Sequence, residues 1–254
     1  MIWIWLMVLL GCSASGDGAF QEGLTALRNG DSSTAVESLS VSVEAGGRDP
    51  AVYHALGNGL YRLGHMGEAA AAWRRGLLLA PRNGDIAANL DHVRAQFTDR
   101  VDPPVVHRGV FFWQSELAPL ETGIVASIAF SFAGWIVVWG RIRMVRSLGG
   151  VSSAARWVAG LAAAVGLLLS VSTFDAINSR QGAVVVAEEV DVRSALGPAG
   201  VSLFVLHEGA EVLVTDKTET HQLIVLADGR KGWVSRSSLL STDPSRSFPL
   251  VRNR

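Results

Sequence analysis

Residues 117–174, LAPLETGIVASIAFSFAGWIVVWGRIRMVRSLGGVSSAARWVAGLAAAVGLLLSVSTF, contain two apolar segments joined by a loop whose charged side chains are all arginines. Segments 122–139 and 157–174 are each uncharged for 18 residues, about the length with which an α-helix crosses the hydrocarbon core of a membrane. The sequence therefore predicts a transmembrane hairpin with helices at 117–140 and 157–175. A pair of buried core helices in a soluble protein is the alternative.

The distribution of charge predicts how this hairpin is oriented. The loop 141–156 carries four arginines and no acid, whereas Glu116, Glu121 and Asp175 lie at the opposite helix ends. The positive-inside rule then places the loop in the cytoplasm and both flanking regions on the other face, which is the periplasm in a bacterium. We therefore expect a bacterial inner-membrane protein, with the lipid bilayer as one partner and both soluble domains periplasmic.

Composition and motifs exclude several classes of function. The net charge of -1 provides no basic field for nucleic acid, so no nucleic-acid partner is expected. The six histidines are scattered and the single cysteine is Cys12, so no pattern typical of metal ligands is present. The sequence also contains no motif of a phosphate-binding loop or of a catalytic nucleophile. The sequence predicts no catalytic residue, no metal and no cofactor, and thus a protein that is not an enzyme.

The amino terminus, residues 1–16, has the pattern of an export signal. Its apolar run 2–11 is too short to span a bilayer but has the length of a signal-peptide core. The run ends in Leu-Leu-Gly-Cys at residues 9–12, which resembles the lipobox of bacterial lipoproteins and implies lipidation at Cys12. Ordinary cleavage after one of the small residues that follow is the alternative, and both remain open.

Residues 17–98 contain an internal repeat. At an offset of 34 positions, Gly23, Gly30 and Ala35 align with the identical residues Gly57, Gly64 and Ala69, and Leu27 and Leu39 align with Tyr61 and Trp73. This period and these residue types resemble the tetratricopeptide family, whose repeats are antiparallel helix pairs. The sequence predicts two repeats followed by a capping helix at 85–97, with Gly57 and Ala69 where the helices touch.

The tetratricopeptide resemblance also implies a binding surface. In that family the first helix of each repeat lines a concave groove that binds peptides or partner proteins. The corresponding residues of this chain are His54, Asn58, Arg62, His92 and Gln96. The alternative interpretation is that these side chains are simply solvated helix faces.

A linker is expected at 99–116, and a small β domain at 181–242. The strands are predicted at 184–186, 190–192, 211–215, 222–227 and 232–234, with Asp228-Gly229 as a hairpin turn. The strings AEEVDVRSALG, LFVLHEGAEVLV and LIVLADGRKGWVSRSSL resemble bacterial SH3 domains. That resemblance implies a surface containing Arg193 and Trp233, although Trp233 as core filler and Arg193 as a turn tether are the alternatives. The tail 243–254 is expected to be disordered.

The order of these modules resembles the BatE-like proteins of the Bat (Bacteroides aerotolerance) group. The expected fold is thus multidomain: an all-α tetratricopeptide repeat domain, a two-helix transmembrane hairpin and a small all-β SH3-like barrel. The resemblance implies a scaffold for protein–protein interaction in envelope or oxidative-stress tolerance. Its implied partners are other Bat proteins, including membrane-bound proteins with von Willebrand factor A domains, and a MoxR-type ATPase. The alternative is a cell-wall sensor whose SH3 domain binds peptidoglycan stem peptides.

Overall fold

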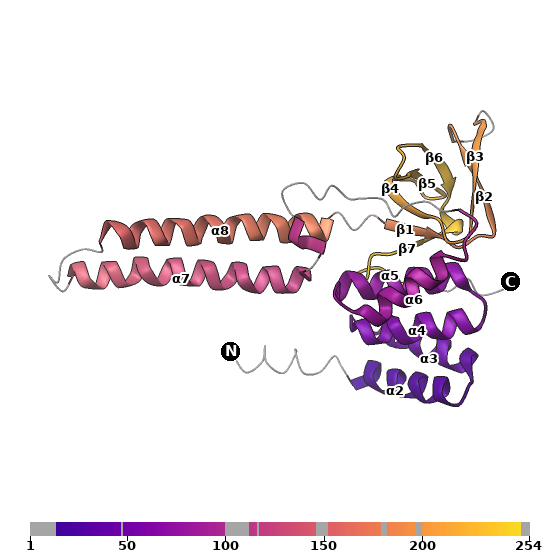
Figure 1. Ribbon diagram of the computed structural model, residues 1–254, viewed down its shortest axis with the longest axis horizontal. Coiled ribbons are helices and arrows are strands. Elements are labelled where there is room, and N and C mark those ends of the chain that lie inside the picture. Colours follow the sequence, from indigo (N-terminus) through magenta and orange to yellow (C-terminus); the bar gives the residue numbers. More distant parts are fainter. Residues whose placement is uncertain are drawn as a thin grey trace. The chain divides into compact units, whose positions relative to one another are not determined.

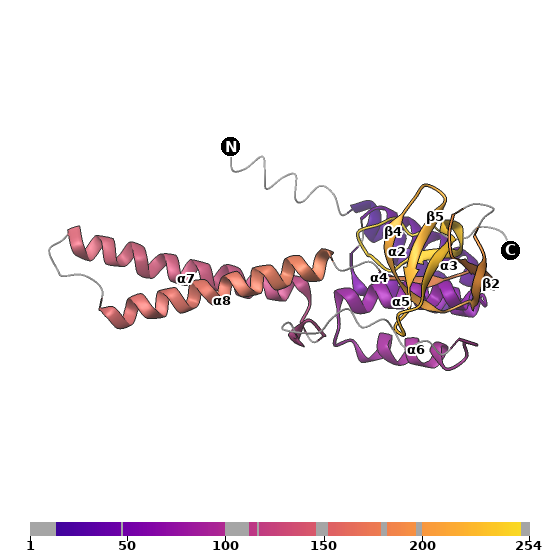
Figure 2. The ribbon, with the colours of Figure 1, turned by 90° about the horizontal axis from the view of Figure 1, so that it is seen from above.

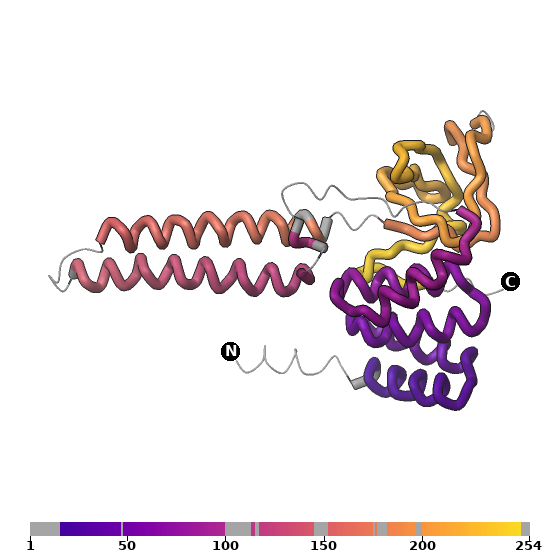
Figure 3. Tube along the Cα trace, in the orientation of Figure 1, coloured from indigo at the N-terminus to yellow at the C-terminus, as the bar shows by residue number. Residues whose placement is uncertain are grey.

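The structure is a computed structural model that describes residues 14–46, 48–99, 112–115, 117–145, 152–178, 182–196 and 200–249 (Figure 3). The predictions for Cys12, for most of the export signal and for the greater part of the linker lie outside these residues. The chain divides into two compact units. One combines the helical region before residue 107 with the β region after residue 179, and the other contains the two long helices.

The helical region consists of consecutive paired helices (Figure 1). Its elements are α2 (Ala14–Arg28), α3 (Ser32–Glu44), α4 (Pro50–Arg62), α5 (Met66–Leu79) and α6 (Gly84–Arg94). Helix α2 packs on α3, α4 packs on α5, and α6 packs on α5. Polar N-caps begin three of them: Asp31 accepts from Thr34 N at 3.0 Å, Asp49 from Ala51 N at 2.8 Å, and Asn83 from Ile86 N at 3.1 Å.

The repeat seen in the sequence is present in the packing. Gly30 and Gly64, which are 34 positions apart, end their helices with φ of 83° and 84°, a left-handed conformation that glycine adopts without strain. Gly23 and Gly57 are also equivalent, and each lies under a large side chain from the following helix, Leu39 and Trp73 respectively. The prediction that Gly57 marks a helix contact is therefore confirmed.

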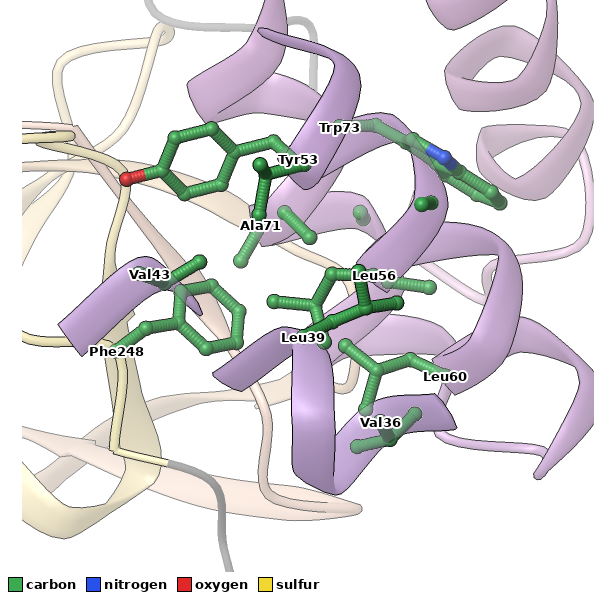
Figure 4. Close-up of a cluster of buried hydrophobic side chains, with 14 of the residues drawn as sticks. Val36, Leu39, Val43, Tyr53, Leu56, Leu60, Ala71, Trp73 and Phe248 are labelled. Carbon is green, nitrogen blue, oxygen red and sulfur yellow. The ribbon is translucent and has the colours of Figure 1, made fainter. Parts of the chain in front are cut away.

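The core of the helical region is one buried cluster (Figure 4). Leu39, Leu56 and Leu60 are at most 1% exposed and come from α3 and α4, so they bind the two helix pairs together. The same cluster contains Val184, Val186 and Leu240 of the β region and Phe248 beyond it. The helical and β regions thus share a core.

The β region is one antiparallel sheet of seven strands in the order β3-β2-β6-β5-β4-β1-β7. The strands are β1 (Gly182–Val185), β2 (Glu189–Arg193), β3 (Ser202–His207), β4 (Glu211–Lys217), β5 (His221–Val225), β6 (Lys231–Ser235) and β7 (Leu239–Ser241), with the 3-10 helix η2 (Arg236–Ser238) before β7. All five predicted strands are present, and β5 and β6 form the predicted hairpin with Gly229 at φ 86°. Strands β3 and β7 were not predicted.

The second unit contains α7 (Pro119–Val145) and α8 (Ser153–Asn178), which lie side by side in both views (Figures 1 and 2). The small residues Ala126, Ala133 and Ala159 are buried, which lets the backbones approach closely. Helix α7 runs five residues beyond the predicted end at residue 140. Arginine and methionine are good helix formers, so the turn that contains Arg141 and Arg143 stays helical.

Polar side chains form a hydrogen-bonded cluster where α7 begins and α8 ends. Ser172 of α8 is fully buried and its hydroxyl accepts from Trp113 Nε1 at 3.0 Å, while Thr122 and Thr173 are bonded at 2.9 Å. Trp113 lies in the 3-10 helix η1 (Phe112–Ser115), inside the segment expected to be linker. Here the linker is therefore packed on α8.

The prediction of disorder from residue 243 onward is wrong for the described part of the tail. Residues 243–249 follow β7, and Phe248 is 1% exposed within the helical core cluster. The two prolines and three arginines of the tail suggested disorder, but the buried Pro244 and Phe248 and the bonded backbone carbonyls hold the described part in place. Residues 250–254 lie outside the described residues.

Candidate functional site

Helix α4, helix α6 and the turn after α6 bring together four of the five predicted groove residues. Asn89 of α6 donates from Nδ2 to Asn58 Oδ1 at 3.0 Å and lies 3.1 Å from His54 Nε2. His54, Asn58 and Asn89 are all half-buried. One amide of α6 thus ties together two side chains that stand one turn apart on α4.

A second polar group continues along the same pair of helices. Gln96 Nε2 donates to Tyr61 Oη at 3.2 Å, and Tyr61 Oη lies 3.2 Å from His92 Nε2. The rings of Tyr61 and His92 meet edge to face with centroids 6.0 Å apart. His92 and Gln96 are exposed. We call the six residues of the two groups the α4–α6 face: His54, Asn58, Tyr61, Asn89, His92 and Gln96.

Arg62 does not join this face. Its NH1 donates to the carbonyl of Leu27 at 2.9 Å, near the end of α2 at Arg28. A guanidinium there satisfies a helix carbonyl and complements the negative end of the helix dipole. In this structure Arg62 therefore links neighbouring helices.

Sequence reasoning missed two members of the face, Asn89 and Tyr61. Asn89 precedes His92 by three residues, a spacing that puts both on one side of α6, and Gln96 follows in the turn after the helix. That periodicity was a usable signal. Tyr61 was assigned only as a repeat residue, although its ring contacts both Trp73 and His92.

The α4–α6 face is equipped for hydrogen bonding. Amides, imidazoles and a phenol offer both donors and acceptors. Among the residues that the structure describes, no three His, Cys, Asp or Glu side chains gather closely enough to hold a metal ion. Such a surface is suited to polar groups of a peptide, whose backbone also presents donors and acceptors.

The structure places the two predicted surface residues of the β region, Arg193 and Trp233, next to each other. Arg193 of β2 stands directly opposite Trp233 of β6 in the antiparallel ladder, so their side chains emerge on the same face. Arg193 is exposed and Trp233 is half-buried. Together they form a small cationic and aromatic patch.

The junction between α5, α6 and the sheet is rich in specific contacts that the sequence did not predict. Glu211 of β4 is 6% exposed and accepts from Arg94 Nε at 2.7 Å, while Arg74 Nε lies 3.6 Å from its other oxygen. Glu208 accepts from Gly67 N at 2.8 Å. Asp99 accepts from His207 N at 2.6 Å. These bonds hold the helical region and the sheet in one arrangement.

Comparison with known proteins adds no relatives to this description. No family model matches the chain, and neither a curated protein nor a solved structure is significantly similar to it.

Proposed function

We propose that this chain is a non-enzymatic scaffold that presents a tetratricopeptide-like surface and an SH3-like surface to partner proteins from a membrane anchor. The α4–α6 face carries the proposal, because polar side chains from two helices converge there on a rigid core. Preorganised side chains lose little conformational entropy when a ligand binds. The ligand class is an extended or helical peptide of a partner protein.

Support for the tetratricopeptide assignment comes from the equivalence of the two helix pairs. The turn glycines, Gly30 and Gly64, and the contact glycines, Gly23 and Gly57, repeat with the same period of 34 residues in sequence and in packing. Support for the SH3-like assignment comes from the short antiparallel strands and the tight turns between them.

Support for the membrane anchor comes from the two long helices. Both are long and apolar enough to span a bilayer, and only 22% and 11% of the most apolar 18-residue stretch of each helix is buried. A core helix of a soluble protein would have most of that surface covered. Together with the arginines between the helices, this favours an inner-membrane protein with both flanking regions periplasmic.

The order of modules leads us to propose a place in a Bat-type complex. The partners would then be membrane-bound proteins with von Willebrand factor A domains and other Bat proteins. The alternative function, a wall sensor that binds peptidoglycan, is favoured by the patch of Arg193 and Trp233, since a cationic aromatic surface can hold carboxylate-bearing stem peptides.

Crosslinking in intact cells, followed by purification and mass spectrometry, separates these proposals. The full-length chain is needed, because the shared core makes deletion of either region disruptive. The face variant carries both Asn89→Ala and His92→Ala on the α4–α6 face, and the sheet variant carries both Arg193→Ala and Trp233→Ala. The exposed change Thr215→Ala is the control. Loss of protein partners only in the face variant supports the scaffold. Unchanged recovery of protein partners by the face variant contradicts the scaffold. Loss of wall fragments only in the sheet variant supports the wall sensor.

A further inference from the structure

Helix α5 contains a buried cation that binds backbone carbonyls at the end of β7 and in the segment that follows it. Arg75 is fully buried. Its Nε and NH2 donate to Ser241 O at 2.9 and 2.8 Å, NH1 donates to Arg246 O at 2.8 Å, and NH2 also donates to Ser247 O at 3.0 Å. Four hydrogen bonds from one guanidinium therefore engage three carbonyls of a single short segment.

One aromatic side chain anchors the same segment. Phe248 is buried in the cluster that contains Val43, Tyr53 and Ala71 (Figure 4). The Arg75 guanidinium carbon lies 4.7 Å from the centre of its ring, within the range of a cation–π contact. Tyr53 adds a long hydrogen bond to Pro244 O at 3.4 Å.

Between the two ends of the segment, Ser245, Arg246 and Ser247 are exposed, whereas Thr242 and Pro244 are buried. A segment whose backbone carbonyls are bound by one guanidinium and whose end is anchored by an aromatic side chain resembles a bound peptide. A buried guanidinium that loses its partners is strongly unfavourable, and burial already lowers the pKa of Arg75. The occupied site is therefore strongly favoured over the empty one.

We propose that Arg75, Tyr53 and the apolar socket around Phe248 form a binding site for an extended peptide segment that carries an aromatic residue, and that residues 241–248 are its ligand in cis. This site is distinct from the α4–α6 face and does not depend on the proposed scaffold function. Because the segment leads directly out of β7, its binding also locks the sheet onto α5.

The tether determines how the site responds to a second peptide. A ligand joined by a short flexible chain has an effective concentration in the millimolar range. A peptide added at micromolar concentration cannot displace an intact segment, but it can fill a site whose own segment has been weakened. Exchange therefore requires a change in the cis segment.

The experiment uses the full chain in detergent and a fluorescent peptide, STDPSRSFP, that copies residues 241–249. Fluorescence anisotropy measures binding to wild type and to Phe248→Ala. We expect the variant to bind the peptide about 100-fold more tightly than wild type, and a peptide with alanine at the position of Phe248 not to bind. Arg75→Met in the Phe248→Ala background should abolish binding.

Phe204→Ala is the matched control. Phe204 also lies under a guanidinium, that of Arg230 at 4.6 Å, but in the sheet, so its loss should create no peptide binding. Equal peptide affinity of wild type and Phe248→Ala, or no binding by a Phe248→Ala protein with native circular dichroism, would overturn the proposal.

A second measurement applies if Phe248→Ala does not fold. A photoreactive phenylalanine analogue at position 248 should crosslink within the chain to the region of Val43 and α5. Millimolar STDPSRSFP should reduce that crosslink, while a scrambled peptide should not. A crosslink to another part of the chain, or one that is insensitive to millimolar peptide, would contradict an exchangeable ligand in cis.

Discussion

The indole of Trp73 lies directly on the backbone of Gly57, where α5 crosses α4. A Cβ atom added at Gly57 would stand 2.4 Å from Trp73 Nε1 and 2.6 Å from Cδ1. Trp73 is 3% exposed, so its ring lies within the core. Both residues belong to the 34-residue repeat, and their contact sets the spacing of the second helix pair.

Gly57→Ala should therefore destabilise the protein. On an open helix the same change stabilises by up to about 1 kcal/mol, but overpacking a filled core costs about 1–3 kcal/mol. We expect a net loss of about 1–2 kcal/mol in the free energy of unfolding, measured by chemical denaturation in detergent. Gly18→Ala in α2 is the control, because a Cβ atom added at Gly18 would meet nothing within 4 Å, and it should be neutral or stabilising. Equal effects of the two changes would show that the close contact is unimportant.

Glu211→Gln should weaken the junction between the helices and the sheet. The carboxylate is 6% exposed and serves both Arg94 and Arg74, so the neutral amide loses two charge-assisted contacts. Hydrogen bonds to charged groups contribute about 1.5–3 kcal/mol each, and partial exposure of both arginines reduces this, so we expect about 2 kcal/mol. Asp91→Asn removes an exposed carboxylate from the same Arg94 and should cost less than about 0.5 kcal/mol. Similar losses for both variants would contradict a special role of the junction.

Asp31 should make stability depend on pH in the acid range. Hydrogen bonds from the Thr34 side chain and backbone, and from Ser33, lower the pKa of this N-cap below its ordinary value of 3.8. Because the folded-state pKa is the lower one, the contribution is fully present above pH 3.8 and is lost as the pH falls through the folded value. Wild type should exceed Asp31→Asn in stability at pH 7, and the difference should shrink as the pH falls below 3.8. Asn83 caps α6 with a neutral amide, so the fold tolerates asparagine at such a position. A difference that stays constant between pH 7 and pH 3 would exclude this linkage.

Much of the architecture followed from local patterns, whereas the contacts between distant segments did not. The apolar runs, the 34-residue period and the valine-rich pieces each depend on neighbouring residues, and they predicted the hairpin, the helix pairs and five strands. Arg75 and Ser241 are 166 positions apart, and an arginine on a helix has the same local pattern whether water or another segment covers it. Val184 and Val186 were predicted as strand residues, but not as part of the core beneath α5.

The groove prediction shows the same limit on a smaller scale. The family resemblance selected His54, Asn58, His92 and Gln96, and the structure brings them together through Asn89 and Tyr61. It also selected Arg62, which the structure places against α2. Helical spacing predicts which residues share a face of one helix, but it does not determine which neighbouring helix a long side chain contacts.

The β region alone, residues 181–242, should not fold stably. Val184, Val186 and Leu240 belong to the buried cluster of the helical region, so the isolated sheet exposes all three. Each loses about 1.5 kcal/mol or more of burial, and the total is comparable with the roughly 3–5 kcal/mol that a core of this size supplies. The fragment should give a poorly dispersed NMR spectrum. Coexpression of residues 14–99 with residues 182–249 should recover a dispersed spectrum and a complex with one copy of each piece, because the shared core and the Arg75 contacts form between them. A cooperative unfolding transition in the isolated fragment would instead show that its core is sufficient without the helices.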